Sequence, residues 1–189
     1  MKTALPLFPL SEARRIGVFL SSRSALPESY HRAARETGDW IGRTGRTLVY
    51  GGARKGLMEE LALHTRAAGG RVYGVVPQIL TERGLVSECI DVVFHCTDLN
   101  DRKTVLMRES DVLVVLPGGI GTVDELFSIL ATGTIGLENK PVVLFNADGC
   151  WDSLLALLDD LQHRGLADAG FRSQLRCVKN IQELVSLFE

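Results

Sequence analysis

The chain has 189 residues, 46% of them hydrophobic and 6% aromatic, and its 21 lysine and arginine residues nearly balance 23 aspartate and glutamate residues. A chain of this length buries about 70% of the surface that it exposes when unfolded, which is enough for one core without disulfide or metal crosslinks. The formal charge of -2 excludes the polybasic surface of a general nucleic-acid binder. Small anionic ligands remain candidates, because a local anion site needs no net positive charge.

Cysteine spacing and the N-terminal segment exclude further classes. Cys89, Cys96, Cys150 and Cys177 form no C-x-x-C pair and have no histidine at zinc-finger spacing, so neither a metal nor a dithiol redox site is predicted. Prolines interrupt the first ten residues, which does not fit a signal peptide, and no run of 18 apolar residues predicts a transmembrane helix. We expect a cytoplasmic protein.

Short apolar runs alternate with longer segments of helical periodicity. Continuous apolar runs are typical of strands that are buried on both faces of a parallel sheet. The alternation predicts an α/β fold with a doubly wound parallel sheet, as a single domain over residues 1–189 with residues 1–14 as a candidate loose tail. The predicted strands cover residues 16–20, 47–50, 72–76, 90–94, 112–116 and 142–145, and the predicted helices cover residues 28–43, 57–68, 99–109, 123–135 and 151–164.

Small residues follow three of the predicted strands. These loops are residues 21–23 (S-S-R), 51–56 (G-G-A-R-K-G) and 117–122 (P-G-G-I-G-T). Because the carboxyl ends of parallel strands meet at one edge of the sheet, we expect the three loops to share one site. Glycines let the backbone approach a ligand, and each loop opens a helix whose N-terminal amides favour an anion. The sequence therefore predicts a site for a phosphate-bearing ligand.

Two common phosphate motifs do not fit. Leu57 and Met58 stand where a Walker A motif needs lysine and serine or threonine, which argues against an NTPase. No G-x-G-x-x-G follows the first predicted strand, and no acidic residue ends the second, so NAD is not indicated. We predict that the protein uses no cofactor.

The string P-G-G-I-G-T-V-D-E at residues 117–125 resembles the signature of the Lonely Guy family, the cytokinin riboside 5'-monophosphate phosphoribohydrolases, long mislabelled as lysine decarboxylases. Residues 50–58 (Y-G-G-A-R-K-G-L-M) are similar to a second family segment, and Arg102-Lys103 to the family's R-K pair. Residues 146–149 (N-A-D-G), with Trp151, resemble a further segment. The resemblance runs in matching order from about residue 16 to about residue 171.

This resemblance implies a Rossmann-like enzyme, a homodimer or larger assembly, that cleaves a nucleoside 5'-monophosphate (AMP or a cytokinin ribotide) into free base and ribose 5-phosphate. It implies Arg102 and Glu125 as the catalytic pair. A carboxylate beside the anomeric carbon can stabilise an oxocarbenium-like ribosyl cation or orient water, and a guanidinium can grip phosphate or ribose oxygens. The implied nucleotide-binding residues are Gly118, Gly119, Gly121, Thr122, Ser22, Gly51, Gly52, Lys103 and Met58.

Structural roles compete with these functional ones. Thr122 and Glu125 also fit a capping box, with Thr122 as the N-cap of the helix. Arg102 could lie on the surface of a helix capped by Asp98, although its apolar neighbours at three and four positions, Leu99 among them, indicate a face that packs inward. Lys103 either touches the phosphate or caps a loop. The negative charge of Asp124 interacts favourably with the helix dipole, and we assign this residue no chemical role.

Departures from the family pattern bear on the substrate and on the assembly. Arg23, Arg54 and Lys55 add positive charge near the expected ligand, and Glu59 stands where the family usually has glycine. Residues 132–136 are rich in glycine where a bulkier stretch would line the base pocket, which favours a plain purine nucleotide such as AMP over a cytokinin. The apolar residues of the helix after the third loop form a candidate dimer face: Phe127, Ile129 and Leu130.

The main alternative is a non-catalytic protein on the same fold. Molybdenum-cofactor carrier proteins bind a phosphorylated pterin on similar glycine-rich loops, and a nucleotide sensor would also need only the phosphate cradle. Arg102 and Glu125 favour hydrolysis, because a binder has no use for a carboxylate at the anomeric carbon. The acid that protonates the leaving base stays open.

Overall fold

The computed structural model describes residues 8–134, 140–167 and 170–189. Its described strands form one seven-stranded sheet in the order β4-β3-β2-β1-β5-β6-β7, in which every neighbouring pair runs parallel. The doubly wound parallel sheet expected from the sequence is confirmed. The strands are β1 (Arg15–Phe19), β2 (Thr47–Tyr50), β3 (Arg71–Pro77), β4 (Val92–Cys96), β5 (Val112–Val115), β6 (Val142–Phe145) and β7 (Leu175–Val178).

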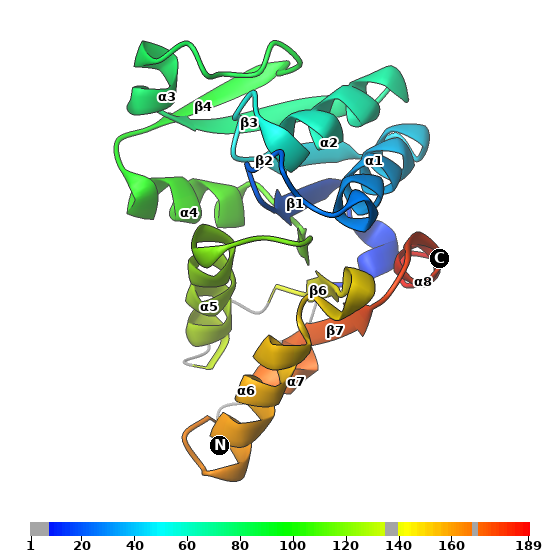
Figure 1. The fold of residues 1–189 in the computed structure, drawn as a ribbon, viewed down its shortest axis with the longest axis vertical. Coiled ribbons are helices and arrows are strands. Elements are labelled where there is room, and N and C mark those ends of the chain that lie inside the picture. The colour runs from blue at the N-terminus through cyan, green and yellow to red at the C-terminus, as the bar shows by residue number, and fades with distance from the viewer. Residues whose placement is uncertain (1–7, 135–139, 168–169) are drawn as a thin grey trace.

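Helices cover both faces of this sheet (Figure 1). On one face α1, α2 and α8 pack over a core that includes Ile16 and Val18 of β1. On the other face α4, α5, α6 and α7 enclose a second core, which includes Phe19 of β1. The helices are α1 (Glu28–Arg43), α2 (Gly56–Ala67), α3 (Gln78–Glu82), α4 (Leu99–Arg108), α5 (Ile120–Thr134), α6 (Asp152–His163), α7 (Gly170–Gln174) and α8 (Ile181–Ser186), with 3-10 turns at Leu10–Glu12 and Ala147–Gly149.

The order of the strands places a topological switch between β1 and β5. From β1 the chain builds the sheet outward through β2, β3 and β4, and then returns to the opposite side of β1 to add β5, β6 and β7. The loops after β1 and β5 therefore turn to opposite faces of the sheet and leave an opening between them, which is where open α/β sheets bind ligands.

The edge strands account for most of the difference from the sequence prediction. β4 begins at Val92 and not at residue 90, because Ile90 packs against Gly74 and the Asp91 carboxylate accepts a hydrogen bond from the Val72 amide at 2.8 Å. β7 was not expected, since its L-R-C-V sequence buries only Leu175 and Val178 and lacks a continuous apolar run.

One local prediction, the dimer face, is corrected. Ile129 and Leu130 do not form a dimer face, because both are buried in the second core under α5, and Phe127 packs partly against the same core. The candidate loose tail at residues 1–14 and the glycine-rich segment at residues 132–136 lie partly outside the described residues. Of the tail, Leu10–Glu12 form a 3-10 turn and Ala13 is buried.

Candidate active site

A cavity of about 570 Å³ opens at the switch between β1 and β5. Its walls come from the β1–α1 loop, the first turn of α2, α4, and the β5–α5 loop with the first turns of α5. Figure 1 shows α4 and α5 next to one another on this side of the sheet. The lining residues are Leu20, Ser21, Ser22, Arg23, Leu26, Tyr30, Met58, Arg102, Pro117, Gly118, Gly119, Ile120, Gly121, Thr122 and Glu125.

Backbone hydrogen bonds join the two loops that flank the switch. The Leu116 amide donates to the Phe19 carbonyl oxygen at 2.9 Å, and the Ser21 amide donates to the Pro117 carbonyl oxygen at 3.1 Å. These bonds extend the β1–β5 ladder past the ends of the strands. The loops after β1 and β5 are therefore held together, as expected from the sequence.

The third loop leads directly into α5. The helix begins at Ile120, and its first turn closes with a 3.0 Å hydrogen bond from the Val123 amide to the Gly119 carbonyl oxygen. Thr122 thus lies inside the first turn and is not an N-cap, so the capping-box interpretation of Thr122 and Glu125 is wrong. The amides that precede Val123 have no carbonyl partner within the helix, and they face the end of the helix that favours an anion.

Close packing of the helix start depends on Gly118. A Cβ atom at this position would lie 2.1 Å from Thr122 Oγ1 and 2.4 Å from Thr122 Cβ. The absence of a side chain at Gly118 lets Thr122 fold back over the loop, where it is 4% exposed.

Arg102 enters the cavity from the first turn of α4. Asp98 caps this helix as predicted, with its carboxylate accepting from the Asn100 and Asp101 amides at 2.8 Å and 2.9 Å. Leu99 is 65% exposed, so the inward-facing side of the helix is marked by buried Val105 and not by Leu99. The guanidinium of Arg102 is half-buried and faces the cavity, which excludes the alternative of an ordinary surface residue.

The loop after β2, residues 51–56, holds this guanidinium in place. Arg102 Nη2 donates to the Gly51 carbonyl oxygen at 3.2 Å, and a Cβ atom at position 51 would lie 1.7 Å from Nη2. The buried Nε of Arg102 has no hydrogen-bond partner among the described residues, so one donor is left for a ligand or water. Gly51 and Gly52 do not line the cavity, and Gly52, with φ +74°, packs against Val76.

Glu125 lies one turn into α5, with its side chain in the cavity wall and only 8% exposed. Burial raises the pKa of its carboxyl group from 4.5 to about 7, while the charge of Arg102 opposes this change and that of Asp124 adds to it. A carboxyl group whose pKa lies near 7 can both accept and release a proton at neutral pH. Arg102 and Glu125 therefore place a permanent cation and a proton acceptor in one cavity.

Lys103 does not reach the cavity. Its Nζ lies 2.8 Å and 3.0 Å from the two carboxylate oxygens of Asp124, so the lysine neither touches the ligand space nor caps a loop. Asp124 therefore forms an ion pair with a residue of α4, besides lying in the first turns of α5, where the helix dipole favours a negative charge. The pair joins the two helices that carry Arg102 and Glu125.

Several cavity residues were not expected from the sequence. Leu26 comes from the β1–α1 loop and Tyr30 from the first turn of α1, and Leu20 and Ile120 add apolar surface. Burial raises the pKa of the Tyr30 hydroxyl, and the charge of Asp148 acts in the same direction. A lone tyrosine after a proline carries no sequence signal for a ligand site.

The 146–151 segment has a structural role in this chain. Asn146 Oδ1 accepts from the Trp151 amide at 2.7 Å, and its Nδ2 donates to Asp152 Oδ1 at 2.7 Å. Asp148 takes a left-handed conformation with φ 48° inside the 3-10 turn. These bonds fix the start of α6 and leave the segment outside the cavity wall.

Other chemistries find little support in the described residues. None of the cavity's lining residues is a lysine that could form a Schiff base, and no cluster of His, Cys, Asp and Glu in the described ranges could hold a metal ion. All four cysteines are free thiols. Among the described helices, none has the length and apolar character of a membrane span.

The chain is an α/β protein with a cavity at the topological switch of its parallel sheet, where helix-terminal amides favour an anion. The chain belongs to the family whose model is described as "Possible lysine decarboxylase", which matches residues 58–188. Curated relatives of this family carry the name of the Lonely Guy phosphoribohydrolases, so the family resemblance drawn from the sequence is confirmed.

Two of these relatives cover most of the chain. The Oryza sativa subsp. japonica protein named "Probable cytokinin riboside 5'-monophosphate phosphoribohydrolase LOGL5" is 35% identical over 179 residues, which is 95% of this chain and 73% of that protein. The Arabidopsis thaliana protein named "Cytokinin riboside 5'-monophosphate phosphoribohydrolase LOG2" is 34% identical over 179 residues, which is 95% of this chain and 84% of that protein.

Solved structures with the same fold include carriers. The molybdenum cofactor binding protein from Rippkaea orientalis matches with a TM-score of 0.71 and 23% identity over 92% of this chain and 93% of that one. The Moco carrier protein from Chlamydomonas reinhardtii matches with a TM-score of 0.69 and 25% identity over 91% of this chain and 93% of that one. This fold therefore occurs in proteins with names as different as carrier and phosphoribohydrolase.

Proposed function

We propose that this protein hydrolyses the N-glycosidic bond of a purine or cytokinin riboside 5'-monophosphate and releases the free base and ribose 5-phosphate. The observation that carries this proposal is the position of Glu125, which is buried beside Arg102 in a cavity that begins at the N-terminus of α5. The naming of relatives at 34–35% identity over 95% of the chain supports it.

The 5'-phosphate would bind at the start of α5. Gly118, Gly119, Gly121 and Thr122 all line the cavity there, and the free amides of a 15-residue helix favour a dianion. Ser22 faces the same space from the β1–α1 loop, and Met58 adds an apolar wall from α2. With the phosphate held at this point, the ribose would extend toward Glu125, which lies one turn further along the same helix.

Arg102 and Glu125 would act on the ribosyl group. When the base leaves with the bonding electron pair, positive charge develops at the anomeric carbon and ring oxygen, and the ionised Glu125 carboxylate stabilises it. Water then attacks the anomeric carbon and loses a proton, and the departed base nitrogen gains one. Glu125, whose pKa is about 7, can accept the proton from water, while Arg102 holds ribose or phosphate oxygens and transfers no proton.

The base preference and the assembly belong to the same proposal. The cavity walls that would surround the base carry Leu26, Tyr30 and Ile120, which suit a flat purine ring in contact with apolar side chains. We propose AMP as well as a cytokinin ribotide as substrates. We also propose a homodimer or larger assembly, as the family resemblance implies.

A carrier is the second candidate, because the solved carriers share the fold. The experiment that separates the two functions incubates the purified protein with AMP and, separately, with isopentenyladenosine 5'-monophosphate, and follows free base by chromatography. The proposal predicts multiple turnovers with equal amounts of base and ribose 5-phosphate. Nucleotide that stays bound and intact would favour the carrier, and the ratio of the two rates gives the base preference.

A further inference from the structure

Arg23 is a cation of the cavity wall that has no partner within the described chain. It follows β1 in the S-S-R loop, it lines the cavity, and its side chain is exposed. No hydrogen bond or ion pair of its guanidinium to another described residue is present, whereas exposed Arg54 of the loop after β2 pairs with Glu88. The charge of Arg23 is therefore available to a ligand.

The backbone that carries this side chain is tightly fixed. The Arg23 amide donates to Ser21 Oγ at 3.1 Å, and the Ser21 amide in turn donates to the Pro117 carbonyl oxygen at 3.1 Å. On the other side Gly56 has φ +56°, and a Cβ atom there would lie 2.3 Å from the Arg23 carbonyl oxygen. The loop is thus clamped between the β5–α5 loop and the start of α2.

The residue after Arg23 is also held. His31 Nε2 donates to the Ser24 carbonyl oxygen at 3.0 Å, and His31 Nδ1 lies 2.6 Å from Glu60 Oε1 on α2. The backbone on both sides of Arg23 is therefore bonded to the rest of the protein. A fixed backbone with one free guanidinium loses little conformational entropy when that guanidinium binds an anion.

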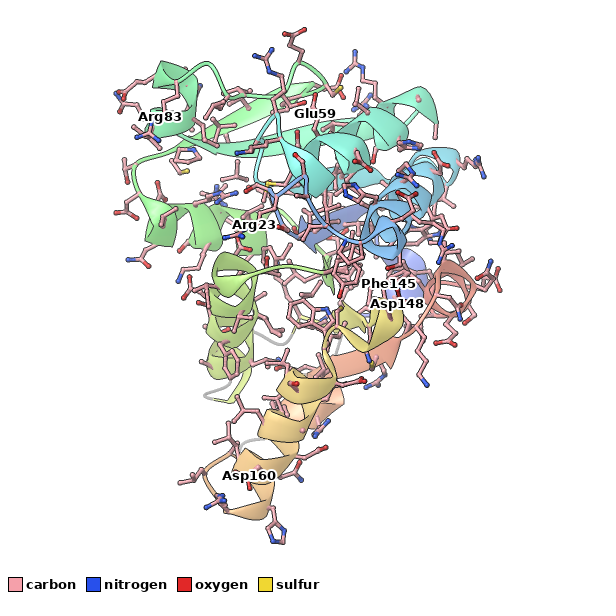
Figure 2. All side chains as sticks on the ribbon, viewed as in Figure 1. Arg23, Glu59, Arg83, Phe145, Asp148 and Asp160 are labelled. Carbon is pink, nitrogen blue, oxygen red and sulfur yellow. The ribbon has the colours of Figure 1, made fainter. Side chains whose placement is uncertain are left out.

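The other cations near the cavity are already engaged. Lys103 pairs with Asp124, and Arg102 donates to Gly51 and lies beside Glu125. Of the two arginines that line the cavity, Arg102 is bonded to Gly51 through Nη2, whereas the guanidinium of Arg23 makes no bond to another described residue. Figure 2 places Arg23 close to the start of α5, whereas Arg83 lies far away at the end of α3.

We propose that Arg23 binds the 5'-phosphate together with the N-terminal amides of α5 and makes the site selective for phosphorylated over unphosphorylated nucleosides. The proposal rests on the proposed function for the identity of the ligand. A guanidinium suits this role because its planar N–H groups can bond two phosphate oxygens at once.

The test measures binding and not turnover. Titration calorimetry with ribose 5-phosphate, AMP and adenosine compares the wild-type protein with Arg23→Gln, Arg23→Lys and the control Arg83→Gln, which removes an exposed arginine outside the cavity. We expect Arg23→Gln to weaken ribose 5-phosphate and AMP about tenfold or more and to leave adenosine unchanged. The affinity of Arg23→Lys for these phosphates should lie between those of the wild type and Arg23→Gln, and the affinity of Arg83→Gln should equal that of the wild type.

Two results would overturn this assignment. One is equal binding of ribose 5-phosphate by Arg23→Gln and Arg83→Gln. The other is an equal loss for adenosine and AMP, which would place Arg23 at the base. Ribose 5-phosphate has no N-glycosidic bond to hydrolyse, so its titration tests Arg23 independently of turnover. Failure to release base from AMP would contradict only the proposed hydrolysis, and the titrations alone decide the assignment of Arg23. Equal thermal unfolding of the variants confirms that the fold is retained.

Discussion

Arg102 Nη2 and the carbonyl oxygen of Gly51 are joined by a 3.2 Å hydrogen bond between α4 and the loop after β2. No Cβ atom fits at position 51 while the guanidinium keeps this place. The loop after β2 therefore acts on the site indirectly, because it positions a cavity side chain and does not itself line the cavity.

Replacing this glycine should impair activity more than stability. In Gly51→Ala the new Cβ would lie 1.7 Å from Nη2, and because that atom ends a flexible side chain, the guanidinium moves while the backbone stays. A displacement of this kind costs about 100-fold in kcat/KM, with a change in unfolding free energy below about 1 kcal/mol. The control is Gly170→Ala, where nothing lies within 4 Å of the new atom. An unchanged kcat/KM for Gly51→Ala would contradict the positioning role.

The activity should depend on the ionisation of Glu125. Burial raises the pKa of this carboxyl group to about 7, and the proposed reaction needs the carboxylate form. We expect kcat/KM for AMP to rise with pH through about 7 and then to level off. A profile that is flat between pH 5 and 9, or that falls over this range, would show that the carboxylate is not the active form.

Arg102 should influence the pH at which kcat/KM rises. Its positive charge lowers the pKa of Glu125, so Arg102→Gln removes a stabilising charge from the carboxylate. The rise in kcat/KM should then move to higher pH, in addition to an overall loss of activity. Asp124→Asn should move it in the opposite direction, because Asp124 raises the same pKa. An unchanged pH profile in both variants would contradict an effect of the Arg102 and Asp124 charges on the pKa of Glu125.

Glu125 should also make stability depend on pH. The unfolded chain releases the proton at about 4.5 and the folded protein at about 7, so the free energy of unfolding falls as pH rises between these values. The loss should reach about 3 kcal/mol above pH 7. Glu125→Gln carries no such charge, so urea unfolding should find it more stable relative to wild type at pH 8 than at pH 5. An equal difference at both pH values would contradict the buried, destabilised carboxylate.

Gly118 and Gly119 should differ sharply although they are neighbours. A Cβ atom at Gly118 meets buried Thr122 at 2.1 Å, whereas one at Gly119 has no neighbour within 4 Å. Gly118→Ala should therefore lower the unfolding free energy by about 1–3 kcal/mol, and Gly119→Ala should change it little. Thermal unfolding of both variants checks this, and equal stabilities would show that the start of α5 tolerates a side chain at Gly118.

The periodicity of the sequence predicts most of the fold but misplaces or misses the strands at the edges of the sheet. The apolar runs predicted the central strands because both of their faces are buried, as in Val112–Val115. The strand Leu175–Val178 is not predicted, because an edge strand buries only part of its residues and its sequence pattern then resembles that of a loop. The start of α5 was placed too late because glycines suggested a loop where the chain already forms helix.

The site could be predicted in part for a similar reason. Gly118, Arg102 and Glu125 belong to strings whose residue types carry chemistry, and all three line the cavity. Tyr30 and Leu26 could not be found, because no motif marks them and they line the cavity only once the chain has folded. Lys103 was expected at the phosphate, but its distance from the cavity depends on a contact with Asp124 in another helix.

The most direct test of the central claim is base release from AMP by wild-type protein and by Glu125→Gln under identical conditions at pH 8, with Asp124→Asn as the charge-matched control. The account predicts release of adenine and ribose 5-phosphate by the wild type, a loss of at least about 100-fold in Glu125→Gln with AMP binding retained, and only a modest change in Asp124→Asn. Equal rates for wild type and Glu125→Gln would contradict it.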